Sequence, residues 1–240
     1  MSNAEKKPSI KRFYKQAGIT EQEGLWLVQL DGRSIRTPRG AVLAVPSKSV
    51  AEAIAKEWDA QGDEVEPDSM ACMQITSAAL DYVAPNRAEV EEELLRYADT
   101  DVLFYREATG ALAERQITDW DPVLGWAKEY YGITPKLTMG VMPVAQDPAL
   151  FDRLQKVLQA KHEIELAVVW MMTKHLASLL LALSVAENQL TADDAFTRSR
   201  IEELVQNERW GEDEEAVARR RAAQDDMRRL ADYYRLLSVK

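Results

Sequence analysis

The first third of the chain alternates apolar and polar residues, as half-buried strands do. The segments Gly24–Leu30 and Arg33–Thr37 flank Asp31-Gly32, a dipeptide that suits a tight hairpin because both positions tolerate positive φ. A second turn at Pro38–Gly40 leads into the apolar segment "AVLAVP". The pattern predicts a small antiparallel meander, which "KRFYKQAGIT" can extend.

Helical spacing replaces this alternation after Ser49. Val50, Ile54 and Trp58 are four residues apart, and Ser49 with Glu52 has the spacing of a capping box. We therefore predict a helix that starts at Ser49, and a compact α+β domain over residues 8–85.

Residues 86–240 are predicted to form a larger all-α domain, an orthogonal helical bundle. The expected helix starts are Asn86 with Glu89, Asp121-Pro122, Asp147-Pro148 and Thr191 with Asp194. The helix after Thr191 is expected to continue to Trp210, and a last helix to run from about Glu212 to Leu237. The fold class is thus α+β, with a small domain of antiparallel strands plus a helix before the bundle.

One apolar segment, Glu165–Glu187, is long enough to span a bilayer. Lys174 and His175 lie near its middle, where a charge is costly in lipid. We therefore expect one buried helix there and no membrane insertion.

Composition narrows the class of protein. The 240 residues are 46% hydrophobic and 29% charged, which is ordinary for a soluble globular protein, and the formal net charge of -10 disfavours nucleic-acid binding. The single cysteine, Cys72, has small apolar neighbours and is expected to be a buried, inert thiol in a reducing compartment. The N-terminal "MSNAEKK" has no apolar run, so a cytoplasmic location is expected.

Catalytic and metal-binding patterns are weak. The glycines form no phosphate-binding loop, and the two histidines, His162 and His175, lack the spacing of metal ligands. His175 is expected to be a hydrogen-bonded core histidine. We predict no catalytic residue, no metal and no cofactor.

The stretch "WGEDEEAVARRR", Trp210–Arg221, is the most unusual. Acidic residues at a helix start are stabilised by the helix dipole, and Glu215 with Arg219 is a favourable i,i+4 pair. Trp210-Gly211 has no such explanation, and a tryptophan beside charges is typical of an interface. A helix start and a protein-binding surface both remain open on this pattern, with catalysis a distant third.

Several blocks spread over nearly the whole chain point to one family. They are Leu30–Pro67, "ITSAALDYV" (Ile75–Val83), "LLRYADTDVLFYR" (Leu94–Arg106), Arg115–Ile133 and "WGEDEEA" (Trp210–Ala216). In order and spacing they resemble the ATP synthase F1 assembly factors, the mitochondrial and alphaproteobacterial chaperones that bind the α subunit of the catalytic head.

The resemblance implies a chaperone without catalysis or nucleotide. It implies that the chain shields the unassembled ATP synthase α subunit until β arrives. A monomer in a bacterial cytoplasm is expected, the eukaryotic equivalent being the mitochondrial matrix. The expected partner-binding residues are Trp210, Gly211, Glu212, Asp213, Glu214, Glu215 and Arg219. Glu214 and Glu215 are the favoured acidic residues.

Three alternatives accompany this interpretation. Asp99 and Asp101 either cap helices at a junction or contact the client. A small hydrolase would combine Asp119 or Asp121 with a C-terminal glutamate, and needs converging carboxyl groups with a raised pKa. A helical adaptor would bind some other protein partner.

Overall fold

The computed structural model describes residues 10–238. The N-terminal "MSNAEKK", on which the expected location rests, lies outside these residues, within 1–9. Contacts divide the chain into two compact units, one made of residues up to Pro85 together with those from Arg235 onward, and one of Asn86–Tyr234. Among the described residues, no helix combines the length and the apolar character needed to cross a membrane.

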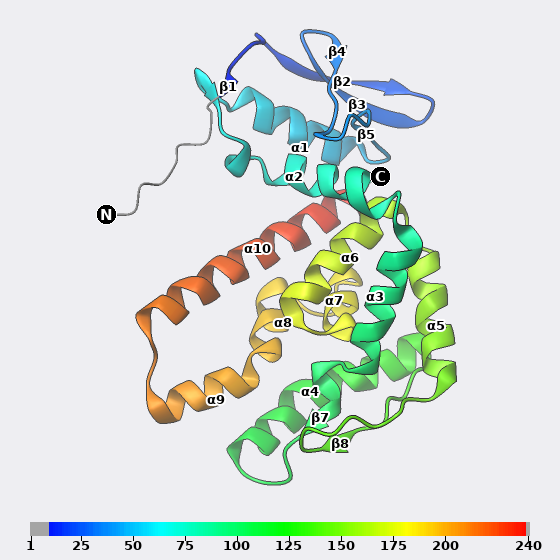
Figure 1. The fold of residues 1–240 in the computed structure, drawn as a ribbon, viewed down its shortest axis with the longest axis vertical. Coiled ribbons are helices and arrows are strands. Elements are labelled where there is room, and N and C mark those ends of the chain that lie inside the picture. The colour runs from blue at the N-terminus through cyan, green and yellow to red at the C-terminus, as the bar shows by residue number, and fades with distance from the viewer. Residues whose placement is uncertain (1–9, 239–240) are drawn as a thin grey trace. The chain divides into compact units, whose positions relative to one another are not determined.

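The N-terminal unit is built on an antiparallel sheet, drawn in blue in Figure 1. Strands β2 (Ala17–Gln22) and β3 (Leu25–Leu30) pair along their full length. The other edge of β3 pairs with β4 (Arg33–Ser34) and with β5 (Ala44–Val45). The predicted hairpin turn is confirmed, since Asp31 and Gly32 have φ of 48° and 78°.

Helix α1 (Lys48–Asp59) packs on this sheet through buried Val50 and Ile54, as the spacing predicts. The predicted cap at Ser49 is wrong, because the helix begins at Lys48 and its cap, Ser47, lies two residues before Ser49. Ser47 has extended backbone, and its hydroxyl oxygen accepts the N–H of Val50 at 3.4 Å. The same hydroxyl donates to the carbonyl of Leu236 at 2.6 Å, which ties Leu236 to the start of α1.

Short elements complete this unit. Strand β1 (Ile10–Lys11) pairs with β6 (Glu64–Val65). A 3₁₀ turn η1 (Pro67–Ser69), helix α2 (Ala71–Ala78) and a π-helical turn η2 (Ala79–Val83) follow.

The second unit is mainly helical, as predicted. Its helices are α3 (Arg87–Asp99), α4 (Ala111–Tyr131), α5 (Pro148–Gln159), α6 (Glu163–Leu176), α7 (Leu179–Ala186), α8 (Ala192–Ser199), α9 (Ile201–Trp210) and α10 (Glu214–Ser238), with a 3₁₀ turn η3 (Val102–Phe104). It also contains a parallel pair that the sequence did not predict, β7 (Tyr105–Arg106) with β8 (Thr138–Met139).

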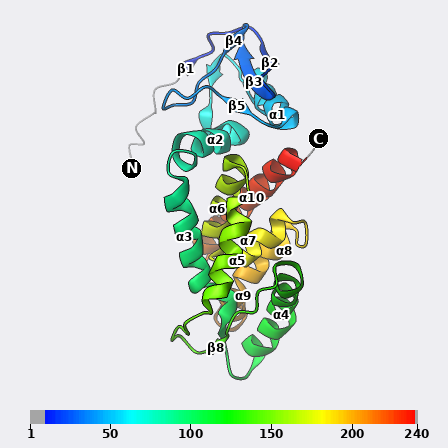
Figure 2. The ribbon, with the colours of Figure 1, turned by 90° about the vertical axis from the view of Figure 1, so that its right-hand side faces the viewer.

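Helix α7 forms the centre of this unit, and all its residues are buried. It contacts α3, α4, α6 and α8, which surround it in Figures 1 and 2. The single helix predicted over Glu165–Glu187 is wrong. Helix α6 ends at Leu176, because the next residue, Ala177, has a φ of 50°. Ser178 then caps α7 by accepting the N–H of Leu181 at 3.0 Å.

Two further helix predictions need correction. Helix α4 starts at Ala111 and runs through Pro122, because the proline removes only one backbone donor while Trp120 and Val123 are buried on either side of it. Thr191 caps α8 as predicted, but the helix ends at Ser199. A second helix, α9, then begins at the fully buried Ile201.

Candidate functional site

The stretch after Trp210 forms the corner between α9 and α10, drawn in orange in Figure 1. Trp210 ends α9 and is 81% exposed. Gly211 follows with φ of 89°, a value that side-chain-bearing residues rarely adopt. Its N–H donates to the carbonyl of Asn207 at 2.8 Å, which ends α9. The glycine thus turns the chain and leaves the indole in solvent.

Two of the four consecutive acidic residues have structural partners. The carboxylate of Asp213 accepts the N–H of Ala216 at 3.0 Å, so it caps α10. The carboxylate of Glu212 accepts a short hydrogen bond from the guanidinium of Arg220. The expectation of a helix start is therefore correct for this half of the cluster.

The other two acidic residues are not held by shielded partners. Glu214 and Glu215 are exposed in the first turn of α10. Glu215 lies 3.5 Å from Arg219, with both side chains more than 70% exposed, so the pair contributes little stability. Glu214 forms no ion pair or hydrogen bond with the side chains of described residues. The surface therefore presents two carboxylates that the fold itself does not require.

Ion pairs fix the corner to its neighbours. Arg220 also donates to Glu203 of α9 at 3.0 Å, and these hydrogen bonds to carboxylates raise the pKa of Arg220. Arg115 of α4 lies 2.9 Å from Glu208 of α9. No local pattern in the sequence marks Arg220 and Glu203, because their pairing joins residues 17 positions apart on two helices.

Few apolar side chains anchor this part of the unit. In α9 only Ile201 is buried, and in α10 the first buried side chain is Met227. A polar hollow lies between α9 and the start of α4, and Trp210, Arg209 and Glu202 contribute to its lining together with Gly110 and Leu112. The corner is thus held mainly by charged groups and stays accessible.

Asp101, the second place singled out in the sequence, lies inside the unit. It is fully buried, and its carboxylate accepts the hydroxyl of Ser178 at 2.9 Å and the N–H groups of Leu180 and Leu103 at 3.2 and 3.1 Å. Burial raises the pKa of Asp101 to about 6, although these hydrogen bonds act in the opposite direction. Asp101 therefore links η3 to the start of α7. Of the two roles considered for it, helix capping and contact with the client, this arrangement corresponds to capping.

The carboxyl groups considered for hydrolysis have basic partners. Asp121 lies 2.8 Å from Arg106, and Asp119 lies 3.8 Å from Arg115. In the described part of the chain, a raised carboxyl pKa is resolved only for Asp101. Residues 10–238 also contain no group of three or more His, Cys, Asp and Glu that could hold a metal. The arrangement expected for the hydrolase is not found there.

The two histidines and the cysteine were the remaining candidates for metal binding or nucleophilic catalysis. His162 caps α6 by accepting the N–H of Ile164 at 3.3 Å. His175 is half-buried, and burial lowers its pKa. Cys72 is only partly buried, so the expectation of a fully buried thiol is wrong.

Known proteins resemble the chain over most of its length. A family model described as ATP12 chaperone protein matches residues 11–128. The mitochondrial protein atp12 of Schizosaccharomyces pombe is 27% identical over 222 residues, which are 87% of this chain and 76% of that protein.

Solved structures agree with this match. The crystal structure of Atp12 from Paracoccus denitrificans has a TM-score of 0.91 and 34% identity, over 95% of this chain and 98% of that one. A point mutant of the same protein gives 0.91 and 35%, with the same coverage. With identity above 30% over nearly both whole chains and a matching family model, the chain belongs to the ATP12 chaperone family.

Proposed function

We propose that the chain is an assembly chaperone of ATP synthase whose client is the unassembled α subunit, held through the α9–α10 corner. Membership of the ATP12 chaperone family supports a role in ATP synthase assembly. The choice of α rests on the sequence resemblance. A subunit waiting for its neighbour exposes an apolar interface, and such patches self-associate unless they are covered.

The observation that carries the proposed surface is the exposure of Trp210 beside Glu214 and Glu215. Tryptophans with accessible faces frequently dominate protein interfaces. Exposed carboxylates at the rim of an interface mainly increase the association rate and select the partner. Such a surface suits a client that must later be released to β. The role requires no catalytic residue and no cofactor.

The test is capture of isolated α by the purified chain, with β as the comparison. We expect Glu214→Gln/Glu215→Gln to lower the association rate about tenfold at low salt. Thermal stability should change little, because each carboxylate contributes only about 0.3–1 kcal/mol through the helix dipole.

A matched control is Glu89→Gln/Glu92→Gln. These two exposed glutamates lie near the start of α3, in the same unit, so the control removes the same charge from another helix start. The proposed surface is wrong if both double variants capture α as the unchanged chain does. Recovery of an unrelated stable partner, with no capture of α, would favour the helical adaptor.

A further inference from the structure

The N-terminal unit contains a pocket that the proposed α-binding surface does not use. It encloses about 600 Å³ and is lined by the segment at Phe13–Tyr14, the β3–β4 hairpin and Trp58 of α1. Tyr14 and Leu30 belong to the hydrophobic core of this unit, and Ile35 and Trp58 pack against that core. The floor of the pocket is therefore apolar.

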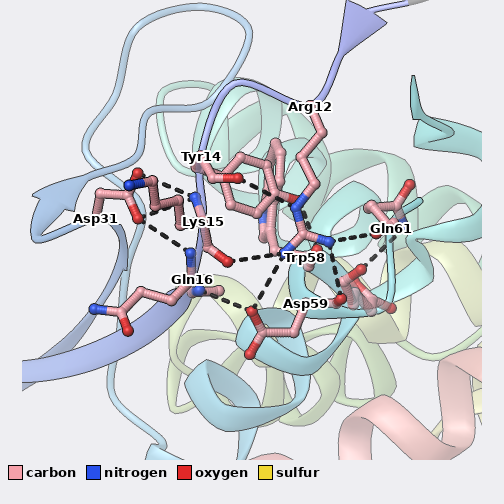
Figure 3. A network of polar contacts seen from close by, with 10 residues as sticks. Arg12, Tyr14, Lys15, Gln16, Asp31, Trp58, Asp59 and Gln61 are labelled. Atoms are coloured by element: carbon pink, nitrogen blue, oxygen red, sulfur yellow. Dashed lines mark hydrogen bonds and ion pairs between the residues drawn. The ribbon is translucent and has the colours of Figure 1, made fainter. Parts of the chain in front are cut away.

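Hydrogen bonds hold one wall of the pocket in place from both ends, as Figure 3 shows. Arg12 donates to the carbonyls of Tyr14, Lys15, Asp59 and Gln61. The guanidinium also lies 4.5 Å from the centre of the Tyr14 ring. This clamp fixes the segment after β1 against the end of α1, so the pocket exists before any ligand arrives.

The hairpin holds the other end of the same segment. The carboxylate of Asp31 accepts the N–H groups of Lys15 and Gln16, each at 3.1 Å. Although Asp31 lines the pocket, its charge is thus directed to backbone donors of the wall.

The rim of the pocket carries the opposite charge to the chain as a whole. Arg33 and Arg36 are exposed on the hairpin and both line the pocket, in a chain of formal net charge -10. Arg36 donates to the carbonyl of Gly40 at 2.6 Å, and the side chain of Arg33 forms no hydrogen bond or ion pair with the described residues. Phe13, also at the rim, is 69% exposed.

We propose that this pocket binds an extended segment of a partner protein in which a large apolar side chain is flanked by carboxylates. The apolar side chain occupies the space over Leu30, Ile35 and Trp58. The flanking carboxylates pair with Arg33 and Arg36, whose planar guanidinium groups match carboxylates with two parallel hydrogen bonds. In an extended peptide, side chains two positions apart point to the same side, so carboxylates two residues before and after the apolar residue can reach the rim while it points inward.

The experiment measures fluorescence anisotropy of a labelled probe, Glu-Glu-Phe-Glu-Glu, with the full chain. We expect saturable binding that Arg33→Glu/Arg36→Glu weakens about tenfold or more, since both charge pairs become repulsive. Phe13→Ala should weaken it several-fold. Lys56→Glu, an exposed charge reversal on α1 outside this pocket, should leave it within twofold.

Three outcomes would overturn the proposal. They are no binding of the probe by the unchanged chain, equal binding of Lys-Lys-Phe-Lys-Lys, and equal loss in the Lys56→Glu control.

Two other occupants are tested in parallel. Arginine-dependent binding of oleate without the peptide would assign an amphipathic anion, and arginine-dependent self-association would assign a second copy of the chain. Because none of these variants touches the α9–α10 corner, capture of α can fail or succeed independently.

Discussion

The guanidinium of Arg220 on α10 lies 3.0 Å from the carboxylate of Glu203 on α9. The same guanidinium reaches Glu212 in the connecting corner, so one side chain joins both helices and the segment between them. Only 17% of the Arg220 side chain is exposed, whereas the side chains of Glu203 and Glu212 are 39% and 47% exposed. Arg220 is thus partly shielded from water, whereas the pair of Glu215 with Arg219 is exposed on the surface.

Replacing Arg220 should therefore loosen the corner. Arg220→Gln is expected to lower the free energy of unfolding by about 1 kcal/mol, a modest value because water screens both carboxylates. Amide hydrogen exchange should accelerate in residues 201–216. Arg219→Gln is the control and should change neither measurement. Unchanged exchange in Arg220→Gln would show that other contacts fix the corner.

Trp210 offers a test that separates binding from folding. Because its side chain is 81% exposed, Trp210→Ala should change the free energy of unfolding by no more than about 0.5 kcal/mol. Capture of the α subunit should weaken by about 2 kcal/mol, the loss typical of an interface anchor. Titration calorimetry and urea unfolding measure the two quantities. Undiminished affinity would remove Trp210 from the proposed surface.

The cap of α1 can be tested with two neighbouring serines. Ser47→Ala removes both the bond from Val50 and the bond to the carbonyl of Leu236, and should cost about 1–3 kcal/mol. Ser49→Ala, inside the helix, should stay within about 0.5 kcal/mol. Urea unfolding of the two variants measures the difference. Equal costs would contradict the assignment of Ser47 as the cap.

Asp101 should make stability depend on pH. Its pKa is raised from 3.8 to about 6 in the folded chain, so the folded state binds a proton more readily than the unfolded state. Stability from this group is therefore gained as pH falls below about 6 and is lost as pH rises through that value. Between pH 7 and pH 5 the gain is roughly 1 kcal/mol.

Asp101→Asn is the comparison for this effect. The variant cannot titrate at this position, and its amide places donors against the Ser178, Leu180 and Leu103 groups, so it should be about 1–3 kcal/mol less stable at pH 7. The gap between the original chain and the variant should widen at pH 5. A gap that stays constant or narrows would show that the carboxyl titrates near its ordinary value.

Sequence predicted the parts of the fold that depend on local chemistry. Asp31-Gly32 forms its turn because both residues tolerate positive φ, and Asp147 caps α5 ahead of Pro148. Pro122 misled the prediction of α4, since a proline suits a first turn but is also tolerated inside a helix that burial of Trp120 stabilises. The break at Ala177 depends on Asp101 and Ser178, which are 77 residues apart, and no local pattern reveals that bond.

At the candidate site, too, only the local features could be predicted from the sequence. The sequence located the acidic stretch and its unusual tryptophan. It could not separate Glu212 and Asp213, which are held in the corner, from Glu214 and the exposed pair of Glu215 with Arg219. The reason is that the partner of Glu212 is eight residues away and also contacts Glu203. The proposed client comes from the family resemblance, because no residue pattern in the chain specifies it.

The hydrogen bond from Ser47 to Leu236 can form only after a long stretch of the chain between them has been synthesised. A ribosome releases the first 85 residues well before residues 235–238, yet these late residues belong to the same compact unit. The hydroxyl of Ser47 therefore has no acceptor until Leu236 has been synthesised. A nascent polypeptide stalled before Arg235 lacks this contact, so the unit that contains α1 is completed only after residues 86–234 of the other unit have been synthesised.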